Sequence, residues 1–188
     1  LGIKPFILSQ ETTAEELQDA VTAFRQDLRD GNDVAFVVRK GALTYDGKPV
    51  FKNPYTLRRE EVIDAVTRVS GRDPVISTTG KASRELFELR VARGESHETD
   101  FLTVGSMGHT SSIALAVAVN KQKTKVWCID GDGAALMHMG AMGVIGAIQP
   151  KNLIHILIDN EAHESVGGMP TVAKTVNFAA GARACGYP

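Results

Sequence analysis

Cysteine, long apolar runs and an excess of one charge are all scarce in this chain of 188 residues, and each scarcity excludes a class of protein. Its two cysteines, Cys128 and Cys185, do not suffice for a disulfide framework, which favours reduced thiols and a cytoplasmic protein. The sequence contains no stretch of roughly 18 apolar residues, the length that a membrane span requires. A formal net charge of −1 argues against nucleic acid or a membrane surface as the main partner.

The N-terminal part of the chain predicts a small parallel unit followed by a linker. Thr13 and Glu16 have the spacing of a capping box, and an amphipathic helix follows them. Apolar runs on both sides of this helix, FIL and VAFVV, predict a parallel strand-helix-strand unit. Residues 40–56 lack periodicity and contain glycine, proline and asparagine, which is typical of a linker. We therefore expect the end of one domain in residues 1–55, a second domain in residues 56–188, and a chain that is cut at both ends.

Strand and helix patterns alternate from Leu57 onward, which predicts an α/β fold with a parallel sheet and helices on both of its faces. The expected strands are residues 74–78, 101–104, 125–129 and 152–158, and the expected helices are 58–70, 83–92, 111–120, 134–148 and 176–185. In such sheets, ligands bind beyond the carboxyl ends of the strands, where the strand order reverses. Glycine-bearing stretches follow these strands, namely TTGKAS, GSMGHTSS, DGDGAA and DNEAHESVGG.

The third of these stretches combines an acid with a site for an anion. Gly131 and Gly133 allow a tight turn from strand to helix, and the backbone N–H groups of Gly133, Ala134 and Ala135 favour an anion at the start of that helix. The carboxylate of Asp132 would repel such an anion unless a cation lies between them, which suggests a hard divalent ion such as Mg²⁺. Taken alone, Asp132 is equally consistent with an ordinary helix N-cap.

The fourth stretch adds further oxygen atoms at a neighbouring strand end. Residues 134–158 provide one helix, one turn and one strand, so that the chain returns to the same edge of the sheet. Asn160 can then offer its amide oxygen, and Ala162 its backbone carbonyl, to the ion that Asp132 holds. Diphosphate oxygens and water would complete the octahedral set of oxygen ligands that Mg²⁺ prefers.

These motifs resemble a known family. GDG, then residues 134–158, then an asparagine after an apolar strand is similar to the thiamine diphosphate and Mg²⁺ signature of the 2-oxoacid decarboxylases. The family signature usually ends in two asparagines, whereas this chain has Asp159 before Asn160. The stretches GDGAALMHMG, IDNEAHESVGGMPT and STTGKASRELFELR most resemble the phosphonopyruvate decarboxylases and next the sulfopyruvate decarboxylases, over most of residues 57–188. The implied fold is the diphosphate domain of the thiamine diphosphate-binding fold.

The resemblance also implies roles for the loop residues. In GSMG, the carbonyl of Gly105 would accept a hydrogen bond from the aminopyrimidine, and Met107 would support the bent cofactor, although a methionine after a strand is more often a core residue. TTGK would contact cofactor or substrate, and the alternative is an ordinary turn before a helix. The implied cofactor-binding residues are Thr79, Gly80, Gly105, Ser106, Met107, Gly131, Asp132, Gly133, Ala134, Ala135 and Asn160, and the implied metal ligands are Asp132, Asn160 and Ala162.

Catalytic candidates come from the cations and histidines near these loops. Lys81, His109 and His163 are the implied active-site side chains, and Lys81 is a stronger candidate than Arg84 for holding an anionic substrate group. The other three histidines, His97, His138 and His155, are interpreted as surface, helix-packing and strand residues, since no pair has zinc spacing and no cysteine partner is evident. No serine, histidine and acid motif supports a hydrolase.

The implied reaction is the thiamine diphosphate- and Mg²⁺-dependent decarboxylation of 3-phosphonopyruvate to phosphonoacetaldehyde and CO₂. Alternatives are decarboxylation of sulfopyruvate or another small 2-oxoacid, or a non-catalytic cofactor-binding module. In this family, an activating glutamate comes from a pyrimidine-binding domain of another subunit, and residues 1–55 contain only the end of such a domain. We therefore expect a homodimer or a larger assembly, and a chain that is inactive alone.

Overall fold

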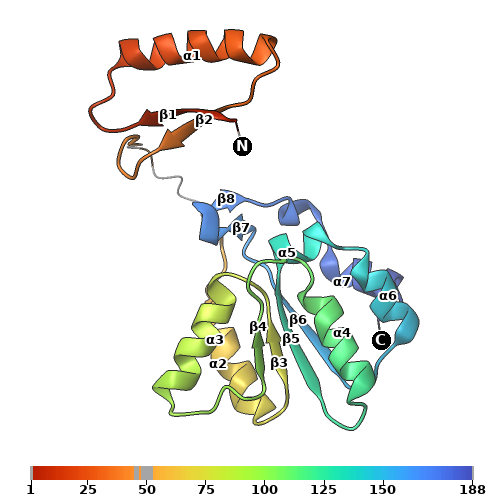
Figure 1. The fold of residues 1–188 in the computed structure, drawn as a ribbon. Helices are drawn as coiled ribbons and strands as arrows, with labels where there is room; N and C mark the ends of the chain where they lie inside the picture. The colour runs from red at the N-terminus through yellow and green to blue at the C-terminus, as the bar shows by residue number, and fades with distance from the viewer. Residues whose placement is uncertain (1, 45–46, 48–52, 188) are drawn as a thin grey trace. The chain divides into compact units, whose positions relative to one another are not determined.

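The computed structural model describes residues 2–44, 47 and 53–187 of the chain (Figure 1). The chain divides into two compact units between residues 48 and 49. Much of the predicted linker, residues 45–46 and 48–52, lies outside the described residues. The assignment of the first unit to the end of a pyrimidine-binding domain stays a prediction.

The first unit is the predicted parallel strand-helix-strand motif. Its elements are β1 (Lys4–Leu8), α1 (Ala14–Arg29) and β2 (Val34–Val38), and β1 pairs in parallel with β2. The capping box at the start of α1 is confirmed, because the Glu16 N–H donates to Thr13 Oγ1 at 3.2 Å and the Thr13 N–H donates to Glu16 at 2.8 Å. The helix buries Ala20 and Phe24, the ring of the latter lying 4.9 Å from that of Phe36.

The second unit is built on a parallel sheet with helices on both faces, and this fold class is the predicted one. The strands, in their order across the sheet, are β4 (Asp100–Leu102), β3 (Val75–Ser77), β5 (Val126–Gly131) and β6 (Leu153–Ile158). Each neighbouring pair is parallel. In Figure 1, one face carries α2 (Arg59–Ser70) and α3 (Lys81–Ala92), and the other carries α4 (Thr110–Asn120), α6 (Ala141–Ile148) and α7 (Phe178–Ala184).

The core follows from the alternation of side chains along the strands. On one face, sheet residues pack against α2 and α3 in a cluster made by Ile63, Val66, Val75, Ala82, Leu86 and Ile129. On the other face, they pack against α4 in a cluster made by Ile76, Ala114, Ala118, Val126 and Cys128. Because both faces are covered, the central strands are almost wholly apolar. None of the described helices is long and apolar enough to cross a membrane.

Two local predictions need correction. The single helix predicted at 134–148 is two helices, α5 (Asp132–Met137) and α6, which are separated at residues 138–140. Glycine at position 140 is a poor helix former, and His138 leaves the helical conformation at the end of α5. The segment after β6 is also more structured than predicted, with the hairpin β7 (Ala162–His163) and β8 (Met169–Pro170) and the 3₁₀ turns η1 (Glu164–Val166) and η2 (Ala173–Thr175).

The strand order reverses between β3 and β5, and this positions the site. After β3 the chain adds β4 on one side, and it then returns to place β5 and β6 on the other side of β3. In parallel sheets, such a reversal opens a crevice beyond the carboxyl ends of the two strands. Thr78 follows β3 at this point, and Asp132 follows β5. The register that pairs Gly131 with Ile158 also brings the end of β6 beside the end of β5.

Candidate functional site

One cavity at these strand ends, hereafter the strand-end cavity, collects most of the predicted site residues. It lies beyond β3, β5 and β6 and includes residues from the loops that follow them. The predicted residues that line it are Thr79, Lys81, Met107, Gly131, Asp132, Gly133, Ala134, Asn160, Ala162 and His163. Loops far apart in the sequence therefore meet at one place.

The remaining predicted residues lie outside the lining of this cavity. Gly80 is next to it, because a Cβ at that position would lie 3.7 Å from Ser165, which lines the cavity. Gly105 and Ser106 form a turn with positive φ angles of 69° and 43°. His109 bonds the Ser106 carbonyl at 3.1 Å, and its ring centre lies 4.1 Å from that of His138. Ala135 is buried in α5. Arg84, which was weighed against Lys81, is exposed on α3.

The predicted metal ligands line the same cavity and are already held by neighbouring groups. Asp132 is 4% exposed, and its Oδ2 accepts a hydrogen bond from Thr171 Oγ1 at 2.5 Å. The side-chain oxygen of Asn160 accepts from the Ala162 N–H at 3.1 Å, which fixes the amide at the turn after β6. Asp132, Asn160 and Ala162 all offer oxygen, the donor that Mg²⁺ prefers, so the donor set fits the predicted ion.

Crowded negative charge at this edge also fits a cation. Burial raises the pKa of Asp159, the hydrogen bond from the Glu161 N–H opposes this, and the nearby carboxylates of Asp132 and Glu161 add to the rise. Like charges that lie close together disfavour the ionised form, and a bound cation relieves that repulsion. Within the cavity, Asp132 offers a carboxylate, and Asn160 and Ala162 offer neutral oxygens, which is a donor set that would suit a divalent ion.

Thr78 also lines the cavity, although only its neighbour Thr79 was predicted from the sequence. Its side chain is 6% exposed, and its Oγ1 has no hydrogen-bond partner within the described part of the chain. Buried hydroxyl groups are nearly always hydrogen-bonded, so an orphan that lines a cavity is suited to a ligand. A hydroxyl beside Asp132 and Asn160 fits a phosphate oxygen.

His163 and Met107 converge on Gly133, at the start of α5. A Cβ at Gly133 would lie 2.5 Å from His163 Cε1, 2.7 Å from His163 Nδ1 and 3.4 Å from Met107 Cε. Glycine at this position therefore leaves the room that the imidazole occupies. The helix start, the histidine and the methionine, three separately predicted features, occupy one corner of the strand-end cavity.

Two further cavity residues, Arg59 and Glu164, have no motif that could reveal them. Arg59 donates to both carboxylate oxygens of Glu85, at 2.8 and 2.6 Å, and donates through its remaining NH1 to Glu164 at 2.9 Å. Lys81 Nζ donates to the same Glu164 oxygen at 3.2 Å, and Asn160 Nδ2 donates to the other at 2.9 Å. Residues from α2, α3 and the loop after β6 thus bind a single carboxylate.

The pKa directions follow from these contacts. Burial alone would raise the pKa of Glu164, but the hydrogen bonds and charges of Arg59 and Lys81 outweigh it and hold that pKa below its usual value. The hydrogen bonds that Arg59 donates to Glu85 raise the pKa of Arg59, against the opposing effect of burial. Both groups are therefore charged at neutral pH, and the cavity contains a stable ion-pair network.

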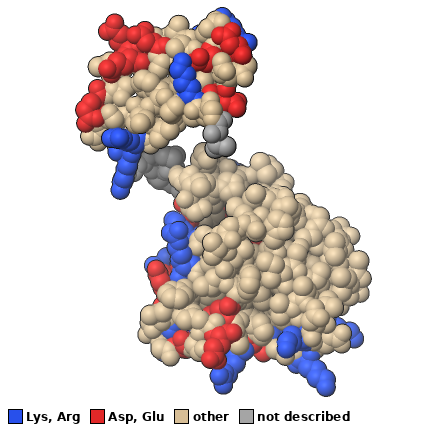
Figure 2. All heavy atoms as spheres, viewed as in Figure 1, with Lys and Arg blue, Asp and Glu red and all other residues tan. Residues whose placement is uncertain are grey.

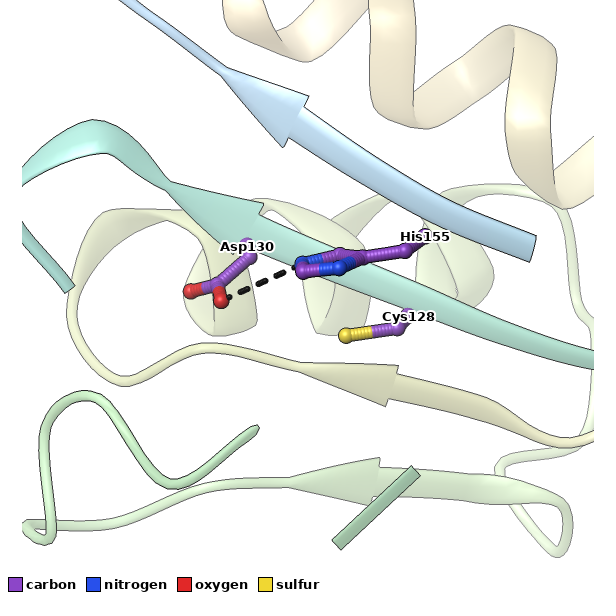
Figure 3. Close-up of side chains that lie close together, drawn as sticks. All are labelled: Cys128, Asp130 and His155. Carbon is purple, nitrogen blue, oxygen red and sulfur yellow. Dashed lines mark hydrogen bonds and ion pairs between the residues drawn. The ribbon is translucent and has the colours of Figure 1, made fainter. Parts of the chain in front are cut away.

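A polar cluster of Cys128, Asp130 and His155 is shown in Figure 3, and in the chain Asp130 directly precedes Gly131 and Asp132. Cys128 and Asp130 alternate along β5, and His155 of β6 pairs in register with Cys128, so that the three side chains lie together. His155 Nε2 lies 3.4 Å from Asp130 Oδ2, and its Nδ1 lies 3.1 Å from the hydroxyl of Tyr187. Asp130 in turn accepts from the Gly131 N–H at 2.9 Å.

This cluster corrects one interpretation of the sequence. His155 is a strand residue as predicted, but it does have a cysteine neighbour, which the separation of 27 positions in the chain concealed. Burial raises the pKa of the Cys128 thiol well above its usual value, and the charge of Asp130 raises it further. The contacts of His155 with Asp130 and Tyr187, and that of Asp130 with the Gly131 N–H, make this cluster a hydrogen-bonded support beneath the Asp132 turn.

The fold and the cavity define a class of protein. Residues 78–188 match the C-terminal TPP binding domain of thiamine pyrophosphate enzymes, that is, more than half of the chain. The chain therefore belongs to the thiamine pyrophosphate-dependent enzymes. This confirms the resemblance that the glycine, aspartate and asparagine motifs indicated.

Curated relatives narrow the class further. Phosphonopyruvate decarboxylase of Streptomyces viridochromogenes is 42% identical over 113 residues, which are 60% of this chain and 27% of that protein. Sulfopyruvate decarboxylase subunit beta of Methanocaldococcus jannaschii is 37% identical over 133 residues, which are 70% of this chain and 68% of that subunit. Sulfopyruvate decarboxylase of Methanosarcina acetivorans is 37% identical over 136 residues, 33% of its length. The chain thus spans 27% of the first of these relatives.

Proposed function

We propose that the protein containing this chain decarboxylates 3-phosphonopyruvate to phosphonoacetaldehyde and CO₂, with thiamine diphosphate and Mg²⁺. The observation that supports this best is the convergence of Asp132, Asn160 and Ala162 on one cavity with cationic side chains. The relatives decarboxylate phosphonopyruvate or sulfopyruvate, according to their names. Sulfopyruvate or another small 2-oxoacid is the alternative substrate.

The residues of the chain have distinct parts in this proposal. Asp132, Asn160 and Ala162 would hold the ion that binds the diphosphate, and the Thr78 hydroxyl, which has no partner among the described residues, would donate to a phosphate oxygen. Met107 would provide an apolar surface for the cofactor within the cavity. When bound, the thiazolium ring supplies the electron sink for loss of CO₂.

His163 is the proposed proton donor. Among the described histidines it is the one that lines the strand-end cavity, and its ring lies over the start of α5. Imidazole is the side chain best matched to proton transfer near neutral pH. Delivery of a proton to the carbon that loses CO₂ would replace the lost carboxylate, and release of the aldehyde would then complete the reaction.

We further propose that the intact enzyme is a homodimer or a larger assembly whose active site uses a pyrimidine-binding domain of another subunit. One relative is named a beta subunit, which supports an arrangement of several chains. The surface also suits an interface. Figure 2 shows few charged side chains over α4 and α6, whose sequences TSSIALAVAVN and AMGVIGAI contain none. Val144 and Ile148 of α6 are 54% and 50% exposed.

The test is a measurement of CO₂ release by the full-length protein. Phosphonopyruvate, sulfopyruvate and pyruvate are each supplied with Mg²⁺ and thiamine diphosphate, and the highest kcat/KM is expected for phosphonopyruvate. A higher value for sulfopyruvate would transfer the proposal to that substrate. Bound cofactor without CO₂ release from any of the three would instead indicate a non-catalytic cofactor-binding module.

A further inference from the structure

We propose that Arg59 and Lys81 form a subsite for the second anionic group of the substrate, and that the Glu164 carboxylate occupies this subsite until the substrate displaces it. This inference rests on the proposed function and adds to it a binding site and its internal competitor. The ligand is a tetrahedral oxyanion on the carbon next to the keto group, either a phosphonate or a sulfonate.

Arg59 is built to bind an anion inside the cavity. Its side chain is 17% exposed, and Glu85 holds the guanidinium through two parallel hydrogen bonds of 2.8 and 2.6 Å. That bidentate contact fixes the plane of the group and directs NH1 toward Glu164. Since the orientation is already set, little side-chain freedom remains to be lost when an anion binds there.

Lys81 provides the second charge on the same spot. Its Nζ lies 3.2 Å from Glu164 Oε2, the oxygen that Arg59 also binds at 2.9 Å. A guanidinium with a fixed direction and an ammonium on a flexible chain suit a tetrahedral oxyanion, since the lysine can adjust to its shape. Arg84, the other basic residue weighed from the sequence, is exposed on α3 and lies outside this cavity.

Glu164 has the position of an internal substitute for the substrate group. Its carboxylate is bound by Arg59, Lys81 and the candidate metal ligand Asn160, and it lines the same cavity. The charges of Arg59 and Lys81 are thus balanced by Glu85 and Glu164 before any ligand binds. Half-buried cations left without partners would be costly, so an exchangeable carboxylate keeps the subsite stable.

Glu164 lies outside the α-helices and the strands of the four-stranded sheet, between β7 and β8. It opens a 3₁₀ turn of three residues, Glu164–Val166, on the loop after β6. Gly167 and Gly168, with φ angles of 95° and 74°, follow that turn. Glycines in this left-handed region cost little strain, so that alternative turn geometries are accessible.

The arrangement predicts discrimination between substrates. An oxyanion on the substrate can replace Glu164 and recover its contacts with Arg59 and Lys81, whereas the methyl group of pyruvate recovers none of them. Selectivity of this kind arises from an interaction that the wrong substrate must break without replacing it.

Binding of methylphosphonate and methanesulfonate to the full-length protein with Mg²⁺ and thiamine diphosphate tests the subsite without requiring turnover. By calorimetry, Arg59→Gln and Lys81→Met should each weaken binding by about tenfold or more, as expected for a charge-assisted hydrogen bond. Glu164→Gln should strengthen binding by about tenfold, because the competing charge is removed. The matched control Arg84→Gln removes a nearby positive charge outside the cavity and should leave the affinity unchanged.

The cation variants should weaken probe binding and Glu164→Gln should strengthen it, and a network with a purely structural role would not produce these opposite changes in affinity. If Glu164 only holds its loop, then Glu164→Gln will weaken binding as the cation variants do, and that result overturns the proposal. If Arg59→Gln does not fold, Lys81→Met still tests the subsite, because the Lys81 side chain is 47% exposed and its replacement should not disturb folding. The probe that binds more tightly identifies the preferred oxyanion.

The kinetic arm separates this inference from the proposed function. Arg59→Gln should raise KM for phosphonopyruvate much more than for pyruvate. An equal rise in KM for both substrates would contradict the subsite but would leave the decarboxylase proposal unaffected. If the cation variants and Glu164→Gln shift probe affinity in opposite directions but the protein releases no CO₂ from any 2-oxoacid, the subsite would be supported and the proposed reaction would be contradicted.

Discussion

Substitution of Gly146 by alanine should destabilise the second unit, because α6 and α7 meet there through their backbones. A Cβ at Gly146 would overlap the backbone carbonyl of Cys185 and would lie 3.2 Å from the Gly186 nitrogen. Backbone atoms cannot rotate away as a side chain can, so the segment around Cys185 must move. That segment also carries Tyr187, whose hydroxyl contacts His155 in the support beneath the Asp132 turn.

The expected magnitude follows from the geometry. Overpacking of a core typically costs about 1–3 kcal/mol, and an overlap with backbone belongs at or above the upper end of that range. The free energy of unfolding should therefore fall by about 3 kcal/mol, against which alanine's better helix propensity recovers less than about 1 kcal/mol. At about 2–4 °C per kcal/mol for a protein of this size, Tm should fall by about 6–12 °C.

The control is Gly143→Ala in the same helix. Nothing lies within 4 Å of a Cβ at Gly143, so the helix propensity of alanine should raise stability by about 0.5–1 kcal/mol. Urea unfolding can be followed by the fluorescence of Trp127, the single tryptophan, which lies in β5 of this unit. Equal shifts of the midpoint in both variants, or a stable Gly146→Ala protein, would refute the backbone contact.

Two further predictions concern the cofactor. Asp132→Asn keeps the shape of the side chain but removes its charge, so the affinity for thiamine diphosphate in the presence of Mg²⁺ should fall by at least about 100-fold. Addition of EDTA should then reduce the affinity of this variant little further. A wild-type affinity in calorimetry would contradict the metal assignment. Gly133→Ala should displace the His163 ring, which NMR of the imidazole can detect, and should weaken cofactor binding. Gly131→Ala is the control for the ring position, because the nearest atom to its Cβ is Thr78 Cγ2 at 3.9 Å, and a shifted ring in this variant as well would argue against direct contact.

The strand-end cavity could be predicted from the sequence wherever local pattern and topology decide the outcome. Apolar strands alternating with helices required a parallel sheet, and parallel strands place their carboxyl ends at one edge. The crossover over residues 134–158 was therefore expected to bring Asp132 and Asn160 to the same edge of the sheet. The register that pairs Gly131 with Ile158 is the structural counterpart of that spacing.

The prediction of a single helix at 134–148 was wrong because apolar content alone does not decide whether a helix is continuous. Its glycines at 140, 143 and 146 weaken helix propensity, and the break runs from His138, which leaves the helical conformation, to Gly140. Gly146 is required for the close approach to α7, which no local pattern can reveal. The residue types were visible in the sequence, but the reason for each of them is a contact made elsewhere.

The groups that hold the site in place were the least predictable, and their positions explain why. Thr171 binds Asp132 across 39 positions of the chain, and Arg59 binds Glu164 across 105. Side-chain hydrogen bonds at such separations leave no periodicity and no spacing motif, in contrast to a capping box or a strand. A ligand can be inferred from the chemistry of the residues it needs, such as oxygen donors for Mg²⁺, because that chemistry constrains residue type. The supporting contacts constrain only shape and charge, which several residue types can satisfy, so that Thr171 and Arg59 become visible only when the loops are placed in space.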